Sequence, residues 1–237
     1  MEVTCCIFLP PSISSSQCHV LETAWHALED AGIDPTSLGG HSVGTYIGAI
    51  SHEFAVLESL RGEKSIFKAT GTGNSLVAGR LSHFLNVRGP AVVVDTACSS
   101  SLVAIHSAVK DLRLGTCSMA LAGGVNLLLT SESSAALKES GLLSPDCRPF
   151  DAGATGFCRG EGCGIVVLKR LSHALAEGNR VYAVIKGSAI EHDGRTQNLT
   201  TPNPMAQEQV IKAAMRDAGV SPDEVCRWTN RAYDTIR

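Results

Sequence analysis

One cysteine stands where the surrounding pattern could present a nucleophile. Residues 92–94 are all valine and predict a short strand buried on both faces, and residues 99–114 carry apolar side chains at helical spacing. Cys98 would therefore lie where a strand turns into a helix. A thiol at the amino end of a helix is near unpaired N–H groups and the positive end of the helix dipole, which favour the thiolate. This setting predicts a reactive thiol, although a buried core cysteine is the common alternative beside an aliphatic strand.

The histidines offer no obvious base for this thiol. His106 falls eight residues after Cys98 on the same predicted helix, a rise of about 12 Å, which is too long for direct proton transfer. His192 lies in a predicted loop, where a solvated or hydrogen-bonded histidine is more common than a catalytic one. We therefore single out Cys98 alone as a candidate catalytic residue.

The remaining cysteines and glycines indicate neither a metal site nor a nucleotide site. Cys147, Cys158 and Cys163 lack the Cys-x-x-Cys spacing of zinc sites, so structural roles are favoured for them. The glycine-rich run at 71–79 loosely resembles a phosphate-binding loop, but no Lys-Ser or Lys-Thr pair follows it. We therefore expect no bound metal and no nucleotide cofactor.

The composition describes a globular protein without a strong charge. Of the 237 residues, 44% are hydrophobic and 18% are charged, and the formal net charge of −3 favours neither nucleic-acid binding nor an anionic membrane partner. No apolar run approaches the roughly 20 residues that a membrane helix needs. The nine cysteines are scattered, odd in number and not preceded by a secretory signal, which predicts reduced thiols in a cytoplasmic protein.

Alternating strand and helix patterns must position Cys98. Residues 1–19 have no clear period and are predicted to be loop, with a serine-rich stretch at 12–16. A helix with one apolar face is predicted from residue 21, and Gly32 and Pro35 end it. Further strands are predicted at 42–50, 119–122, 125–129, 164–168 and 181–190, and further helices at 131–140, 171–177 and 205–218. Such alternation predicts a layered α/β fold.

Two distant segments share one pattern. Residues 27–38 and 214–225 both run from the end of a predicted helix through glycine, an aliphatic residue and proline to another aliphatic residue. Glycine and proline are favoured at helix ends in general, so coincidence is one explanation. The other is an internal duplication, in which the first copy leads into the predicted strand at 42–50. Residues 226–237, which follow the second copy, have no strand pattern.

The segment Asp95-Thr-Ala-Cys-Ser-Ser-Ser101 resembles the nucleophile motif of β-ketoacyl synthases, the ketosynthases of polyketide and fatty-acid synthesis. Further segments resemble this family in the same order along the chain, from about Leu21 to Val225. They lie at residues 21–32, 79–85, 88–90, 122–126, 148–151, 159–162, 167–170, 192–195 and 201–204. Because these segments match in order over most of the chain, the resemblance does not depend on one short motif that could match by chance.

The resemblance implies a thiolase-like fold, which is a duplicated α/β unit. This agrees with the pattern that residues 27–38 and 214–225 share. On this basis we expect an atypical leader at 1–19, a partial ketosynthase domain at 20–225 and a divergent tail at 226–237. The first half of the duplicated fold would be nearly complete and the second half truncated. The resemblance also implies a homodimer in the complete enzyme.

The resemblance further implies the chemistry of an acyltransferase. Cys98 would accept an acyl group from the phosphopantetheine arm of an acyl carrier protein, or from a coenzyme A thioester. A malonyl-type extender would then lose carbon dioxide, and its carbanion would attack the Cys98 thioester in a Claisen condensation. The product would be a polyketide or fatty-acid intermediate.

The chain departs from the family where two histidines are expected. A His-Gly-Thr-Gly-Thr motif and an Asn-x-Gly-His motif supply the groups that stabilise the enolate in the family, and neither occurs in this sequence. The alternative interpretation is therefore a catalytically incomplete fragment or pseudo-enzyme. Such a protein would act at most as a carrier-binding or dimerisation module.

Overall fold

The computed structural model describes residues 13–62 and 66–225, which belong to two compact units. The first unit comprises the described residues up to Ser134 together with Gly160–Arg180, and it contains Cys98. The second comprises Ala135–Arg159 and the described residues from Val181 onward. Helix α6 (Glu132–Glu139) begins in the first unit and ends in the second.

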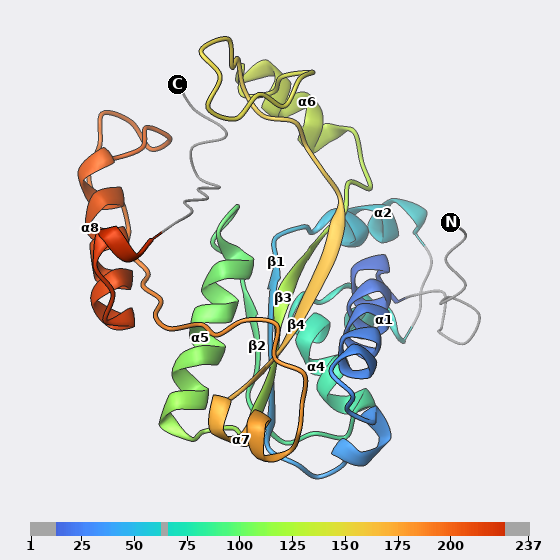
Figure 1. Ribbon diagram of the computed structural model, residues 1–237. Helices are drawn as coiled ribbons and strands as arrows, with labels where there is room; N and C mark the ends of the chain where they lie inside the picture. The colour runs from blue at the N-terminus through green and yellow to red at the C-terminus, as the bar shows by residue number, and fades with distance from the viewer. Residues whose placement is uncertain (1–12, 63–65, 226–237) are drawn as a thin grey trace. The chain divides into compact units, whose positions relative to one another are not determined.

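A four-stranded mixed sheet forms the centre of the first unit (Figure 1). Its strand order is β2 (Ala91–Val94), β1 (Val43–Ala49), β3 (Met119–Asn126) and β4 (Gly162–Lys169). β1 is parallel to both β2 and β3, and β4 is antiparallel to β3. Parallel neighbours require crossover connections, which here contain helices, so the sheet is covered by helices on its faces.

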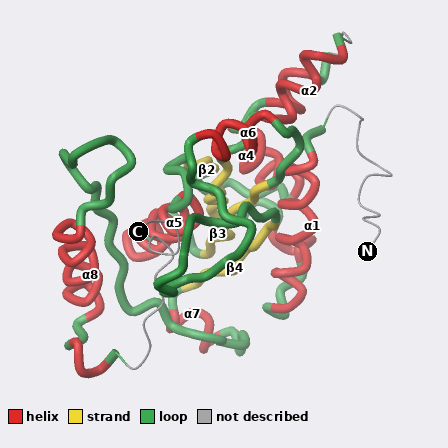
Figure 2. The backbone as a smooth tube through the Cα atoms, turned by 90° about the horizontal axis from the view of Figure 1, so that it is seen from above, coloured by secondary structure: helices red, strands yellow, loops and turns green. Residues whose placement is uncertain are grey.

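Helices cover both faces of this sheet, as Figure 2 shows from above. Helices α1 (Ser15–Asp30) and α4 (Ser75–Phe84) pack on one face, and α5 (Ser100–Leu114) packs on the other. Successive side chains of a strand point to opposite faces. In β1, Val43 and Ile47 therefore contact the α1 and α4 layer, whereas Tyr46 belongs to the cluster that packs against α5.

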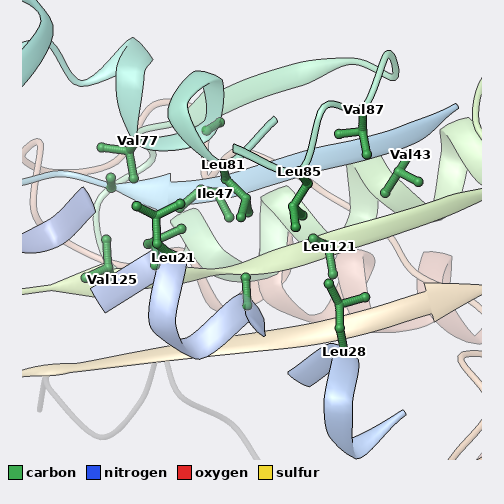
Figure 3. Packing of buried hydrophobic residues seen from close by; sticks show 14 of the residues in the cluster. Leu21, Leu28, Val43, Ile47, Val77, Leu81, Leu85, Val87, Leu121 and Val125 are labelled. Carbon is green, nitrogen blue, oxygen red and sulfur yellow. The ribbon is translucent and has the colours of Figure 1, made fainter. Parts of the chain in front are cut away.

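The larger hydrophobic core lies between the sheet and the α1 and α4 layer (Figure 3). The predicted apolar face of α1 is confirmed, since Leu21, Ala24 and Leu28 are all buried in it. Most of the other core residues come from the two central strands and from α4. They include Val43, Ile47, Leu121 and Val125 of the strands and Val77, Ala78 and Leu81 of α4.

Shorter helices complete the first unit. They are α2 (Glu53–Arg61), α3 (Lys68–Thr72), α7 (Leu171–Ala176) and the 3₁₀ helix η2 (Pro35–Leu38). The Glu53 carboxylate, at the start of α2, accepts hydrogen bonds from the N–H groups of Leu129 (2.5 Å) and Thr130 (2.8 Å). It also accepts one from the Ser133 hydroxyl, so it satisfies donors that lie just before and within the first turn of α6.

In the second unit, α8 (Pro204–Ala218) and the 3₁₀ helix η3 (Pro222–Glu224) are the regular elements that follow α6. Asn203 caps α8, because its side-chain oxygen accepts hydrogen bonds from the N–H groups of Met205 and Ala206, and Pro204 occupies the first helical position. Gly187 lies against this helix, where an added Cβ atom would be 2.3 Å from the backbone nitrogen of Ala218.

The two segments that share a sequence pattern also share a backbone structure. α1 and α8 both end in a left-handed glycine, Gly32 (φ +69°) and Gly219 (φ +64°). The residue after each glycine donates its N–H to a carbonyl five residues earlier, Ile33 to Leu28 (2.9 Å) and Val220 to Met215 (3.1 Å). A 3₁₀ helix that starts on proline follows in both cases. Residues 226–237, whose sequence shows no strand pattern, lie outside the described residues.

Most predicted elements are confirmed, with two changes of boundary. α1 begins at Ser15 rather than after residue 19, because the Ser14 side chain caps it by accepting a hydrogen bond from the Gln17 N–H. The serine-rich stretch read as loop thus contains a helix start. The strands predicted at 119–122 and 125–129 form one strand, β3, which continues through Gly123 and Gly124.

Two strand predictions are wrong. Residues 181–190, which were expected to be a strand, form neither strand nor helix in the second unit. Their aromatic and β-branched residues favour an extended chain, but a strand also needs a partner with which to exchange hydrogen bonds. β2 is present but is not buried on both faces, because it is the edge strand of the described sheet and Val92 is 38% exposed.

Candidate active site

Cys98 occupies the predicted junction between a strand and a helix. β2 ends at Val94, Ser99 is the N-cap residue of α5, and α5 begins at Ser100. The Cys98 side chain is exposed rather than buried in the core. The thiol thus lies two residues before the start of a helix of 15 residues.

The turn that carries Cys98 contains an unfavourable backbone conformation. Ala97 has a φ of +53°, in the left-handed region that residues with a Cβ atom rarely adopt. This conformation costs about 1–2 kcal/mol for a residue other than glycine. The Ala97 N–H donates to Oδ1 of Asp95 at 3.2 Å, and the Ser99 hydroxyl donates to the carbonyl oxygen of Thr96 at 2.8 Å. The Asp95 side chain therefore bonds to Ala97 itself, whereas the Ser99 side chain bonds to Thr96.

A second serine bonds directly to the strained turn. The Ser100 hydroxyl accepts a hydrogen bond from the Thr96 N–H at 2.9 Å and donates one to the Ala97 carbonyl oxygen at 2.6 Å. Ser100 is only 5% exposed, so its hydroxyl exchanges these partners poorly with water. The sequence analysis included Ser100 in the nucleophile motif but gave it no role.

Two glycines of the sheet let the start of α5 approach closely. A Cβ atom on Gly48 of β1 would lie 2.6 Å from the backbone nitrogen of Ser101 and 2.7 Å from the carbonyl carbon of Ser100. A Cβ atom on Gly124 of β3 would lie 2.9 Å from the Ser101 Cβ. The sequence analysis missed both glycines. The signal that could have found them is glycine inside a strand, which marks close approach of another backbone.

The histidines considered in the sequence analysis differ in their surroundings. His106 lies on α5 in the first unit and is half-buried. His192 lies in the second unit, is exposed and accepts the Gly194 N–H on Nδ1 at 2.9 Å, as expected for a hydrogen-bonded loop histidine. The described part of the structure does not show either histidine hydrogen-bonded to the Cys98 sulfur.

The other cysteines do not form a metal centre in the described parts of the chain. No group of three or more His, Cys, Asp or Glu side chains within residues 13–62 and 66–225 is arranged to hold a metal ion. Cys158 is exposed and donates its S–H to the Ser144 carbonyl at 3.2 Å. Burial raises the pKa of Cys163, which lies in β4.

The glycine-rich run at 71–79 forms parts of α3 and α4 rather than an open phosphate-binding loop.

Family comparisons agree with this fold. Residues 10–174 match the model of the β-ketoacyl synthase N-terminal domain, and residues 182–235 match that of the β-ketoacyl synthase C-terminal domain. The layered α/β fold with its mixed sheet is thiolase-like. The chain belongs to the β-ketoacyl synthase family. The matched residues extend beyond the 20–225 range at both ends.

Curated relatives identify the type of ketosynthase. The chain is 49% identical over 209 residues to one phenolphthiocerol/phthiocerol polyketide synthase protein of Mycobacterium tuberculosis, and 50% identical over 209 residues to a second one. Both alignments cover 87% of this chain but only 14% and 11% of the respective relatives. Within the family, the chain is therefore similar to the ketosynthase parts of polyketide synthases, and it spans a small part of these relatives.

Solved structures lead to the same classification. The ketosynthase from module 6 of the bacillaene synthase of Bacillus subtilis aligns with a TM-score of 0.84 at 38% identity, over 92% of this chain and 38% of its own. An oxazolomycin ketosynthase domain of Streptomyces albus aligns with a TM-score of 0.84 at 38% identity, over 90% of this chain and 38% of its own. The chain spans less than half of either structure. No helix within the described residues is both long and apolar enough to cross a membrane.

Proposed function

We propose that this chain supplies the acyl-accepting part of a polyketide ketosynthase and that Cys98 is the acyl acceptor. The observation that carries the proposal is the exposed Cys98 thiol between the end of β2 and the start of α5. The Cys98 thiolate attacks the carbonyl carbon of an acyl thioester and forms a new carbon–sulfur bond. The bond from that carbon to the sulfur of the carrier breaks, and the released carrier thiolate takes up the proton that Cys98 lost.

The acyl donor in this proposal is the phosphopantetheine arm of an acyl carrier protein or a coenzyme A thioester. The relatives, which are polyketide synthases and ketosynthases, support a thioester substrate and favour polyketide over fatty-acid synthesis. The proposal also includes a homodimer in the complete enzyme and a cytoplasmic location. It requires no metal and no nucleotide cofactor for the acyl transfer itself.

The second half-reaction of the proposal is decarboxylative condensation. A malonyl-type thioester loses carbon dioxide, and the resulting carbanion attacks the acyl carbon on Cys98, which releases the Cys98 thiolate. The two histidine motifs that stabilise the enolate in the family do not occur in these 237 residues. We therefore assign acyl acceptance to this chain and propose that condensation needs residues supplied from elsewhere. The alternative is a module that binds carrier proteins or dimerises without catalysis.

An acyl-transfer assay tests the role of Cys98. The chain is incubated with a radiolabelled acyl coenzyme A, and protein-bound label is mapped by peptide mass spectrometry. We expect label on Cys98, none on the Cys98→Ala variant and an unchanged level on a matched Cys147→Ala variant, since Cys147 is also exposed. Equal labelling of the wild-type chain and Cys98→Ala would remove Cys98 as the acceptor.

A second measurement separates the two functional alternatives. The acylated chain is mixed with a malonyl-charged acyl carrier protein, and the release of carbon dioxide and of condensed product is followed. We expect acylation without condensation for the isolated chain, because the enolate-stabilising histidines are absent from its sequence. Condensed product from the purified chain alone would contradict this division of roles.

A further inference from the structure

We propose that Ser100 is a positioning residue for acyl transfer: its hydroxyl holds the left-handed turn that presents Cys98. The proposal rests on the proposed function, because the reaction it serves is acyl transfer to Cys98. The hydroxyl accepts the Thr96 N–H at 2.9 Å and donates to the Ala97 carbonyl at 2.6 Å. It therefore bridges the two ends of the dipeptide that immediately precedes the nucleophile.

The bridge matters because of the conformation of Ala97. An alanine relaxes from a φ of +53° to the negative φ values that its Cβ atom favours unless other contacts prevent it. That rotation would turn the peptide that joins Ala97 to Cys98, and the Cys98 sulfur would leave the position that the turn now gives it. The Ser100 hydroxyl opposes the rotation, because the same hydroxyl holds the Thr96 N–H and the Ala97 carbonyl.

The position of Ser100 is itself fixed by the sheet. Ser100 is 5% exposed, and its backbone N–H donates to the same Ala97 carbonyl at 3.1 Å. Beneath it, the missing side chain of Gly48 leaves only enough room for the Ser100 and Ser101 backbone. The hydroxyl is thus held between the sheet and the turn. Both of its hydrogen-bonding capacities serve the backbone, so its role is to orient the turn rather than to contact the substrate.

Ser99 provides a matched comparison. It lies next to Cys98, is exposed, and its hydroxyl bonds to Thr96 through the carbonyl oxygen (2.8 Å) and Oγ1 (2.9 Å). No hydrogen bond of the Ser99 hydroxyl to Ala97 is present in the described structure. If the bridge across Ala97 is what positions Cys98, loss of the Ser99 hydroxyl has a small effect and loss of the Ser100 hydroxyl a large one.

The first experiment measures the rate of Cys98 acylation by an acyl coenzyme A in three variants of the chain. We expect Ser100→Ala to lower the rate constant at saturating thioester at least tenfold, with little change in the half-saturating concentration. Ser100→Thr keeps the hydroxyl and should recover the rate to within about threefold of wild type. Ser99→Ala should stay within about twofold. A wild-type rate in Ser100→Ala, or equal losses in Ser100→Ala and Ser99→Ala, would overturn the proposal.

Iodoacetamide alkylation, followed residue by residue, separates positioning from general loss of structure. Cys117 is 1% exposed, so it reacts only when the first unit opens. We expect Ser100→Ala to lower the rate of Cys98 alkylation at a fixed pH, while Cys117 stays protected. A Cys98 alkylation rate equal to that of wild type would show that the hydroxyl does not set the position of the thiol.

A double variant decides the case if Ser100→Ala exposes Cys117. Glycine adopts positive φ without steric cost, so Ala97→Gly combined with Ser100→Ala removes the need for the bridge. We expect this double variant to protect Cys117 and to acylate within about fivefold of wild type. Continued exposure of Cys117, or acylation as slow as in Ser100→Ala, would overturn the role assigned to the turn. If wild type and Cys98→Ala instead take equal label, the proposed function fails, and the rate of Cys98 alkylation at a fixed pH still tests Ser100.

Discussion

The hydroxyl of Tyr46, in the centre of β1, donates a hydrogen bond to Oδ2 of Asp111 in the last turn of α5. Tyr46 is 1% exposed, and its ring lies over Gly44, where a Cβ atom would be 2.5 Å from the ring. On the same face of β1, Gly48 receives the start of α5. Tyr46 therefore holds the last turn of α5 by a hydrogen bond, and Gly48 lets the first turn of α5 lie close to the sheet.

Stability should fall at alkaline pH because of two buried groups beside this contact. Burial and the hydrogen bond to Asp111 raise the pKa of Tyr46, and burial raises the pKa of Cys117. Unfolded thiols and phenols ionise from about pH 8.5 and pH 10 respectively, whereas the folded groups stay protonated. The unfolded state then binds fewer protons, so the free energy of unfolding decreases as the pH rises.

Urea unfolding between pH 7 and pH 10.5 measures this effect. We expect a constant free energy of unfolding up to about pH 8.5 and a decline above it, with a slope of up to about 1.4 kcal/mol per pH unit for each group. Cys117→Ala should reduce the decline that begins near pH 8.5, to which the Cys163 thiol also contributes, whereas Cys147→Ala, at an exposed position, should leave the slope unchanged. A slope that is the same in Cys117→Ala and wild type would contradict the assignment.

Gly48→Ala should damage both the fold and the reactivity of Cys98. The added methyl group meets the backbone of Ser100 and Ser101 rather than a flexible side chain, so α5 must shift. We expect a loss of about 1–3 kcal/mol in the free energy of unfolding and slower acylation of Cys98. Gly164→Ala in β4 is the control, because its Cβ atom would meet nothing within 4 Å. Similar behaviour of the two variants would show that close approach is not what Gly48 provides.

The sequence predicts the place of Cys98 well because that place depends on local patterns. Three valines, a turn and an amphipathic stretch are each readable within a few residues, and the structure has β2, the turn and α5 in that order. The contribution of Gly48 cannot be read in the same way, since it lies far from Ser100 in the chain and acts only once β1 and α5 meet. The role of the Ser100 hydroxyl likewise depends on the φ of Ala97, which no propensity indicates for alanine.

The strand errors have a related cause. Alternation of side chains encodes which face of a strand is apolar, but it does not encode which strand lies next to it. Residues 181–190 have the composition of a strand and form no strand among the described residues, and β2 has a buried-strand composition at a sheet edge. The missed start of α1 is different, because Ser14 followed by a helix is a readable cap signal.

Gln17→Leu should destabilise the first unit although leucine is apolar and Gln17 is 1% exposed. The Gln17 amide nitrogen donates to the carbonyl oxygens of Thr70 and Gly71, both at 3.2 Å, and its oxygen accepts from Nε of Arg80 at 2.7 Å. Leucine would remove these three hydrogen bonds and leave the Arg80 Nε–H without the acceptor it now has. The Thr70 carbonyl keeps the bond from Nη2 of Arg80 (2.9 Å), and the Gly71 carbonyl keeps the bond from the Ser14 N–H (3.1 Å). We expect a loss of about 1–3 kcal/mol.

The measurement for Gln17→Leu is the urea midpoint followed by Trp25 fluorescence, since Trp25 lies on the same helix. His26→Ala, on the exposed side of α1, is the control and should change the free energy of unfolding by less than about 0.5 kcal/mol. Equal midpoints for Gln17→Leu and wild type would show that the buried amide contributes no net stability.

The two helix ends that share a sequence pattern should respond alike to substitution of their glycines. Gly32 and Gly219 both have φ near +65°, with no atom within 4 Å of an added Cβ, so the cost of a side chain there comes from the backbone alone. Alanine should cost about 1–2 kcal/mol at either position, and asparagine less, because asparagine tolerates the left-handed region. The expected order of stability is therefore glycine, asparagine, alanine at both sites.

Hydrogen exchange of peptides from α1 and α8 measures this order separately in the two units. If the order of stability and the free-energy differences between variants are similar at Gly32 and Gly219, the two helix ends share their energetics as well as their sequence pattern. The left-handed glycine alone is not distinctive, because Gly115 ends α5 with φ +77° as well. What sets the pair apart is the 3₁₀ helix that starts on proline at Pro35 and Pro222. If alanine is tolerated at Gly219 but not at Gly32, the two ends are related in backbone geometry only and their likeness has no common energetic basis.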